Sequence, residues 1–332
     1  MSTELGSLEQ AIYAIIISFV VGMILCPIVI PMLHKLKFGQ NVRDDGPQSH
    51  LQKQGTPTMG GIVFLIAFAV ASVFFLKENH DGMAVVLVTM GYGAIGFLDD
   101  YIKVVMKRSL GLRASQKIVL QLIVTGAFCY YLQIRGMGTA IYIPFTQSMM
   151  LDLSIFYVPF LFVAVLGTVN GVNLTDGLDG LAGGVTLIVA AFFAIAAWAA
   201  GSTITPICGA IIGGLLAFLI FNSYPARVFM GDAGSLALGG FVAATAFVLK
   251  MPVFIVIVGF VYLLETVTVI LQVGYFKWTK HKHGEGLRLF KMAPFHHHLE
   301  QCGWKETKVV TLFYVMTAMF CLIGFLGCKY LF

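Results

Sequence analysis

Apolar runs as long as a membrane-spanning helix recur along the whole chain, and this pattern restricts the fold more than any other feature. A helix needs about 20 apolar residues to cross a bilayer, whereas a β-barrel strand needs about ten alternating ones. Only 11% of the 332 residues are charged, compared with roughly a quarter in an average soluble domain. Because the chain lacks the polar groups to cover a water-soluble surface, we predict an all-α polytopic integral membrane protein.

Ten segments are apolar enough to be expected as transmembrane helices, within a single domain that covers residues 1–332. They are Ala11–Leu33, Met59–Leu76, Gly82–Leu98, Ile118–Leu132, Ile155–Val169, Leu181–Ala200, Pro206–Phe221, Gly234–Leu249, Val253–Phe276 and Val309–Cys328. The fourth, fifth and seventh segments are short for a bilayer, so we expect them to extend into their flanks. A small hairpin is expected over Thr139–Ser154.

The Lys and Arg residues are distributed unequally between the two sides of the predicted membrane. Of the 21, 17 fall in alternate connections, residues 34–58, 99–117, 170–180, 222–233 and 277–308. The positive-inside rule makes these segments cytoplasmic and places both termini outside. Ten of the 16 acidic residues fall in the same segments, so we expect the active-site cleft on the cytoplasmic side. The net charge of +5 is then explained by the orientation in the membrane and by contact with anionic lipids, and no nucleic acid partner is expected.

Two acidic motifs flank predicted helix ends. Asp99 and Asp100 end the third segment, where carboxylates oppose the helix dipole, so a metal-proximal or proton-accepting pair is favoured over a solvated helix end. Asp232 lies between glycines just before the eighth segment. There the helix end can attract a phosphate while the carboxylate holds a cation. An N-cap aspartate is the alternative, and the two roles are compatible.

The stretch 170–180 is polar and glycine-rich although it lies between two apolar segments. It contains two amides, a hydroxyl and two carboxylates, and Asp176 and Asp179 would share one face if the stretch were helical. Glycine allows such a loop to approach a ligand closely. A ligand-binding loop is therefore favoured over an ordinary turn.

Three further features have competing interpretations. His296, His297 and His298 are consecutive, so they cannot all face one small metal. A role as phosphate donors or metal-facing ligands is favoured over a zinc hydrolase or a solvated loop. The glycines of residues 91–96 match a dinucleotide fingerprint, but they lie inside an apolar segment and indicate close helix packing instead. Glu265, inside the ninth segment, must be paired or face water, and its role stays open.

Several aspartates in separate cytoplasmic segments, accompanied by Asn, His and Lys and no soft ligand, are typical of an oxygen-rich Mg²⁺ site for a polyanion. Phosphoryl transfer needs mainly positioning and charge neutralisation. A site at the membrane edge also suits a reaction between one lipid-borne and one water-borne substrate. The residues therefore favour a magnesium-dependent phosphoryl transferase.

Five motifs, in the same order along the chain, closely resemble those of the bacterial phospho-N-acetylmuramoyl-pentapeptide-transferases. They are DGPQSHLQKQGTPTMGG (45–61), GFLDD (96–100), NGVNLTDGLDGLA (170–182), FMGDAGS (229–235) and APFHHHLE (293–300). The resemblance implies transfer of phospho-MurNAc-pentapeptide from UDP-MurNAc-pentapeptide to undecaprenyl phosphate, giving lipid I and UMP with Mg²⁺ as cofactor. It also implies a ten-helix fold and a homodimer in the bacterial cytoplasmic (inner) membrane, with the active site facing the cytoplasm.

The same resemblance implies roles for individual residues. Asp232 would ligate Mg²⁺, Asp99 would be the base or nucleophile supported by Asp100, and His296 would assist at the phosphates. The remaining substrate-binding residues are predicted to be Lys53, Asp176, Asn222 and Phe229 around the uridine, with the Phe229 ring stacked on uracil, Lys103 at the lipid phosphate, and Thr58, Asn170, Asn173, Asp179 and His297 elsewhere in the cleft.

Alternatives stay open for the order of bond formation and for the function itself. Asp99 either accepts the proton of the lipid phosphate in a single displacement or forms an acyl phosphate in a double one. The single step is favoured because a phosphate already carries nucleophilic oxygens. A sister enzyme that transfers GlcNAc-1-phosphate from UDP-GlcNAc to undecaprenyl phosphate is one alternative function. A membrane transporter is another, although its ionisable residues would be expected near the midplane, where only Glu265 lies.

Overall fold

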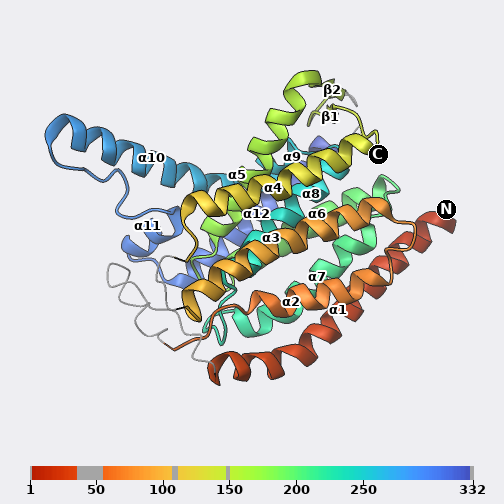
Figure 1. The fold of residues 1–332 in the computed structure, drawn as a ribbon, viewed down its shortest axis with the longest axis horizontal. Coiled ribbons are helices and arrows are strands. Elements are labelled where there is room, and N and C mark those ends of the chain that lie inside the picture. Colours follow the sequence, from red (N-terminus) through yellow and green to blue (C-terminus); the bar gives the residue numbers. More distant parts are fainter. Residues whose placement is uncertain (1, 36–54, 107–110, 147–149, 330–332) are drawn as a thin grey trace.

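The structure, a computed structural model, describes residues 2–35, 55–106, 111–146 and 150–329. Most of these residues are helical (Figure 1). The helices are α1 (Ser2–Lys35), α2 (Gly61–Val73), α3 (His80–Val104), α4 (Ala114–Ile134), α5 (Tyr157–Thr175), α6 (Leu181–Ala199), α7 (Thr205–Asn222), α8 (Gly231–Val248), α9 (Phe254–Val258), α10 (Phe260–His283), α11 (Phe295–Gln301) and α12 (Glu306–Gly327), with a 3₁₀ turn η2 (Ser154–Phe156). The predicted hairpin is confirmed, since β1 (Ala140–Tyr142) pairs antiparallel with β2 (Met150–Asp152).

The all-α polytopic membrane fold predicted from the sequence is confirmed. Within the described ranges, nine helices are long and apolar enough to cross a membrane, and α2 is a shorter apolar helix. The ninth predicted segment is not one continuous helix, because it is interrupted at Gly259 between α9 and α10. A Cβ at residue 259 would lie 2.7 Å from the Ile255 carbonyl oxygen, so glycine permits the interruption.

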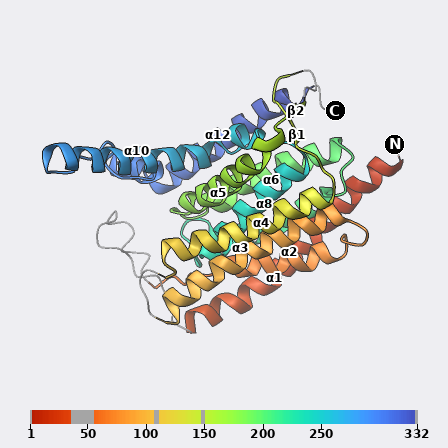
Figure 2. The ribbon, with the colours of Figure 1, turned by 45° about the horizontal axis from the view of Figure 1, so that its top comes forward.

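Helix α8 occupies the centre of the bundle (Figures 1 and 2). Of its most apolar stretch, 89% is buried, whereas the corresponding share is 22% for α1 and for α10. A helix that is apolar on all sides is buried by its neighbours, and a partly exposed one borders the surrounding medium. Asp232, in the first turn of this central helix, is therefore held by a well-packed element.

Glycines allow several helices to pack closely. On α7, a Cβ at Gly209 would lie 2.6 Å from the Ala11 carbonyl oxygen, and one at Gly213 would overlap the carbonyl oxygen of Ile15. This spacing of two small residues is a common helix–helix contact in membranes. Gly96 of α3 meets α8 in the same way, because a Cβ there would overlap the Asp232 carbonyl oxygen, whereas Gly93 lies against Leu65 of α2 and Ala237 of α8. These contacts agree with the interpretation of residues 91–96 as a packing motif.

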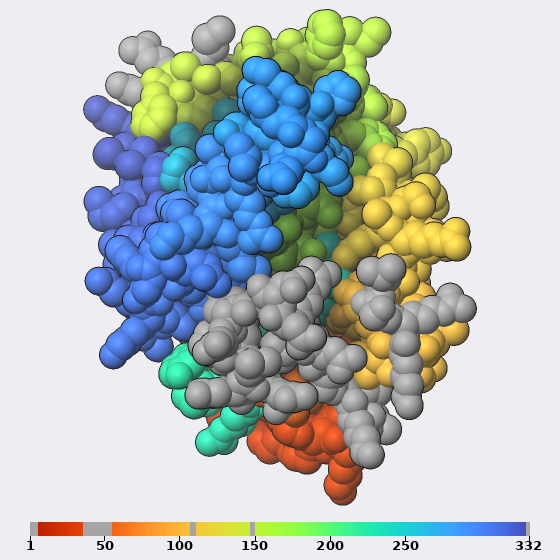
Figure 3. Space-filling view, turned by 90° about the vertical axis from the view of Figure 1, so that its left-hand side faces the viewer, coloured from red at the N-terminus to blue at the C-terminus, as the bar shows by residue number. Residues whose placement is uncertain are grey.

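The two ends of the bundle differ. The labelled chain ends and the β1–β2 hairpin lie at one end, and α10 projects beyond the other helices toward the opposite end (Figures 1 and 2). Figure 3 looks at that opposite end and shows a recess between α10 and α4, with the green residues of α5 at its floor.

Replacing Gly213 should destabilise the bundle. The added methyl of Gly213→Ala overlaps a backbone oxygen of α1, and overpacking of this kind typically costs about 1–3 kcal/mol. We expect the apparent Tm in detergent to fall by about 5 °C. The matched control is Gly274→Ala on α10, which meets nothing within 4 Å and should keep or raise the Tm. A Gly213→Ala protein with the parental Tm would contradict this packing.

Candidate active site

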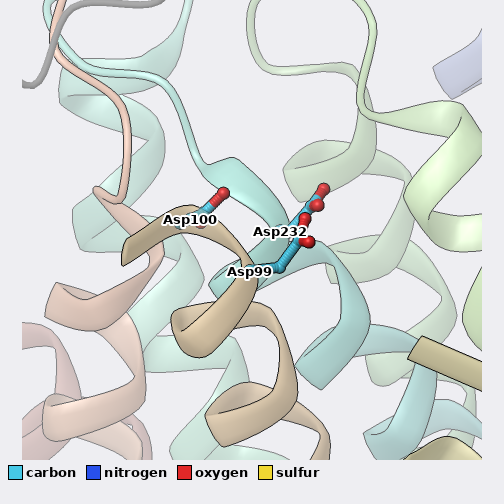
Figure 4. Close-up of side chains that lie close together, drawn as sticks. All are labelled: Asp99, Asp100 and Asp232. Carbon is cyan, nitrogen blue, oxygen red and sulfur yellow. The ribbon is translucent and has the colours of Figure 1, made fainter. Parts of the chain in front are cut away.

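Three predicted acidic residues converge from two helices. Asp99 and Asp100 lie in the last turns of α3, and Asp232 lies in the first turn of α8. One carboxylate oxygen from each lies within 4.8 Å of the others, and Figure 4 shows the three side chains together. Asp99 and Asp100 are only 2% and 3% exposed. Such a concentration of buried negative charge requires cations or hydrogen-bond donors nearby.

The contact between α3 and α8 brings these carboxylates together. A Cβ at Gly96 would overlap the backbone carbonyl of Asp232, so a larger residue would push the helices apart. The Asp100 carboxylate accepts a hydrogen bond from the Ala233 amide at 3.0 Å. This bond satisfies a free amide in the first turn of α8 and places negative charge at the favourable end of that helix. Gly231, with φ +75°, makes the tight entry into α8.

Two lysines neutralise part of the cluster. The Lys103 ammonium lies 2.6 Å from Asp99 Oδ2 and 2.7 Å from Asp232 Oδ2. Lys117 Nζ, from the first turn of α4, lies 2.9 Å from the same Asp232 oxygen. Lys103 was predicted at the lipid phosphate, and the structure places it on the carboxylates. The sequence interpretation missed Lys117, for which the one available signal was a lysine directly before a predicted transmembrane segment.

The two predicted asparagines have different surroundings. Asn173 donates from Nδ2 to Asp232 Oδ1 and to Ser235 Oγ, both at 2.8 Å, so it belongs to the cluster, as does Ser235, which was not predicted. Asn170 instead pairs with Gln121 of α4 at 2.9 Å. Both asparagines are helical because α5 continues to Thr175, so the predicted loop at 170–180 begins only at residue 176.

The remaining loop holds Asp176 and Asp179, and it is not helical. The two carboxylates therefore do not share a helix face. Desolvation raises the pKa of Asp176 from 3.8 to about 8, and the neighbouring carboxylates of Asp232, Asp100 and Asp179 add to this effect. Asp179 is buried; its Oδ2 accepts the Ala226 amide at 2.9 Å, and its own amide donates to Glu306 at 2.8 Å.

The residues expected around the uridine are only partly described. Lys53 lies outside the described residues. Asn222 is buried, and its Nδ2 donates to the Val228 carbonyl at 2.9 Å, so it shapes the connection to Phe229. The Phe229 amide donates to the Pro57 carbonyl at 2.8 Å. This contact brings the buried Thr58 beside the start of α8, where a Cβ at Gly231 would lie 3.0 Å from its hydroxyl oxygen.

The three consecutive histidines point to different partners. His296 is fully buried between Glu265 and Gly177. His297 Nδ1 lies 2.8 Å from Glu300 Oε2. His298 Nδ1 accepts the Lys291 amide at 3.2 Å. The expectation that they do not share one metal agrees with this arrangement.

The aspartate cluster fits a divalent cation. Over the described ranges, the set of Asp99, Asp100 and Asp232 is the one group of three His, Cys, Asp or Glu residues whose ligand atoms lie close enough to hold a metal. Carboxylate oxygens alone are the ligands of hard cations such as Mg²⁺, whereas Zn²⁺ sites use His and Cys. The donor set is therefore compatible with the predicted magnesium ion.

The raised pKa of Asp176 predicts a pH-dependent stability. Without metal, folded Asp176 keeps its proton up to about pH 8, whereas the unfolded chain releases it near its ordinary value of 3.8. The parent protein therefore loses stability as the pH rises between these values. Asp176→Asn has no carboxyl group at this position, so it should not show the loss of stability that Asp176 causes. We expect the Tm advantage of the variant to grow by at least about 5 °C between about pH 4 and pH 8.5.

The control is Asp152→Asn in the β1–β2 hairpin. A hydrogen bond from Thr139 lowers the pKa of Asp152, so this variant should lose stability relative to the parent as the pH rises. A Tm difference for Asp176→Asn that is independent of pH would show that Asp176 is not held protonated.

Known proteins resemble this chain over most of its length. Residues 82–250 match the model of glycosyl transferase family 4, and residues 53–65 match signature 1 of phospho-N-acetylmuramoyl-pentapeptide-transferase. Among proteins of that name, the chain is 51% identical to the one from Clostridium botulinum (strain Alaska E43 / Type E3) over 95% of both chains. It is 48% identical to one from Clostridium kluyveri, over 96% of this chain and 99% of the relative. The chain therefore belongs to the phospho-N-acetylmuramoyl-pentapeptide-transferase family.

Proposed function

We propose that the protein transfers phospho-MurNAc-pentapeptide from UDP-MurNAc-pentapeptide to undecaprenyl phosphate, forming lipid I and UMP. The observation that carries this proposal is the convergence of Asp99, Asp100 and Asp232 with Lys103 and Lys117 at the ends of membrane helices. Phosphoryl transfer depends on such groups, because catalysis consists mainly of positioning and charge neutralisation. The name shared by relatives near 50% identity supports the muramoyl substrate.

The carboxylates are proposed to hold Mg²⁺, with Asp232 as the main ligand. Asp99 and Asp100 offer oxygens within reach of the same point. When bound, the ion would neutralise the negative charge of the diphosphate. The two lysines that now contact Asp99 and Asp232 would then be available to the phosphates of the substrates.

The reaction is proposed to be a single displacement. An oxygen of the lipid phosphate bonds to the β-phosphorus of the nucleotide, and the bond from that phosphorus to the bridging oxygen breaks, so that UMP leaves. Asp99 Oδ1 accepts the Leu112 amide at 2.7 Å, and Lys103 lies 2.6 Å from Oδ2. The Leu112 amide keeps the carboxylate in place, and Oδ2 can accept the proton of the lipid phosphate once Lys103 moves to the phosphates. Because that phosphate already carries nucleophilic oxygens, Asp99 need not be the attacking group.

The orientation in the membrane follows from the charge distribution. We propose that the carboxylate end faces the cytoplasm in a bacterial inner membrane and that both termini lie outside. The positive-inside rule supports this orientation, and the chain ends lie away from the end that Figure 3 views. A water-soluble nucleotide would then enter from the cytoplasm and the lipid phosphate from the bilayer. A homodimer remains part of the proposal because the family resemblance implies it.

The two alternative functions have less support. A sister enzyme that uses UDP-GlcNAc would share the carboxylate cluster, but the relatives carry the muramoyl name. A transporter would need ionisable groups along a path through the bilayer. Glu265, the candidate for such a group, accepts backbone amides of Phe295 and His296 instead.

Replacing Asp232 should abolish transfer without unfolding the protein. Asp232→Asn keeps the shape of the side chain but removes the charge that holds the cation, so we expect UMP release with Mg²⁺ to fall at least about 100-fold. Asp152→Asn, the same change in the outer hairpin, should retain parental activity. UMP release is measured with the muramoyl nucleotide and with UDP-GlcNAc. Mg²⁺-dependent turnover in Asp232→Asn would contradict the metal assignment, and turnover of UDP-GlcNAc alone would favour the sister enzyme.

A further inference from the structure

Glu265 is an ionisable residue inside a membrane helix that the proposed reaction does not use. It lies on α10 and is 0% exposed. Its Oε2 accepts the Phe295 amide at 2.7 Å, and its Oε1 accepts the His296 amide at 3.3 Å. A buried carboxylate is costly unless donors satisfy it. The two amides explain how the chain tolerates Glu265, and they connect α10 to the start of α11.

The ring of His296 lies between this carboxylate and the loop that follows α5, which holds Asp176 and Asp179. His296 is 0% exposed, and its Nδ1 is 3.2 Å from Glu265 Oε1. On the other edge, a Cβ at Gly177 would overlap Nε2, so the ring packs directly under the residue that follows Asp176. Within the part of the chain that the structure describes, neither ring nitrogen makes an aligned hydrogen bond. An unpartnered buried nitrogen costs free energy, so the ring is placed to gain a partner when the loop or a ligand moves.

We propose that Glu265 is a positioning residue that acts through His296. The two amide bonds fix the start of α11, and a carboxylate beside Nδ1 favours a proton on that nitrogen. Nε2 is then the nitrogen directed toward the loop of Asp176, where it can take up a proton and, as an imidazolium balanced by Glu265, donate to a phosphate oxygen of the nucleotide. This inference rests on the proposed function, in which His296 assists at the phosphates of the nucleotide.

A matched residue on the same helix allows a controlled test. Gln272 also receives backbone amides from the segment before α11, because its Oε1 accepts Leu289 at 3.0 Å and Phe290 at 2.9 Å. The Gln272 side chain therefore holds the segment before α11 as Glu265 holds the start of α11, but none of these partners is an imidazole. A purely structural role of Glu265 should therefore resemble that of Gln272, whereas a positioning role should depend on His296.

The experiment is a double-mutant cycle on UMP release from the muramoyl nucleotide, with Mg²⁺ and undecaprenyl phosphate. Glu265→Gln should lower kcat by about 30-fold and change KM for the nucleotide by less than about 3-fold. In a His296→Ala background, the same substitution should lower kcat by less than about 3-fold. Gln272→Ala should change kcat by the same factor in both backgrounds. An equal loss for Glu265→Gln with and without His296 would overturn the proposal.

A second measurement applies even when Glu265→Gln does not fold. Nitrogen-15 NMR of histidine-labelled parent protein reports which ring nitrogen of His296 is protonated, and the His296 signal is identified by its absence in His296→Ala. We expect a proton on Nδ1; a ring protonated on Nε2 alone would overturn the proposal. A parent protein that releases no UMP from the muramoyl nucleotide would contradict the proposed function, and the NMR result would then decide this inference separately.

Discussion

The close approach of α3 to α8 at Gly96 is the constraint on which the site depends. The absence of a side chain there lets the backbone of Asp232 pack against α3, and this contact sets how far Asp232 lies from Asp99 and Asp100. In a membrane, where lipid is as apolar as the side chains, such van der Waals contact between small residues is a principal source of helix association. The packing and the chemistry of this protein are therefore properties of the same few residues.

The electrostatics of the cluster follow from that packing. Three carboxylates within 4.8 Å of one another would repel strongly in a partly desolvated site. The structure balances them with Lys103 and Lys117, the Asn173 amide and the free amides at the start of α8. All of these partners are polar, so a cation and a diphosphate can replace them. The same groups that stabilise the carboxylates can bind an anionic substrate.

The sequence predicted the membrane class, most helices and the three central aspartates, because hydropathy and short motifs are local properties. The predictions from the sequence were incomplete where contacts between distant residues determine the structure. Asn173 is helical because Asp232 and Ser235 satisfy its side chain, so a polar stretch extends α5 where a loop was expected. Lys117 and Glu265 could not be placed, since their partners are 115 and 31 residues away in sequence. Gly96 was recognised as a packing residue, but which helix it faces is visible only in the structure.

The most direct measurement of the central claim is divalent-cation binding by Gly96→Ala. Mn²⁺ serves as a spectroscopic substitute for Mg²⁺, and its affinity is measured by EPR on purified protein whose folding is verified by circular dichroism. The account predicts Mn²⁺ affinity at least about tenfold weaker than in the parent. Gly91→Ala, whose methyl meets only the Val124 side chain at 3.2 Å, should bind as the parent does. Parental Mn²⁺ affinity in folded Gly96→Ala would contradict the claim that this helix contact builds the site.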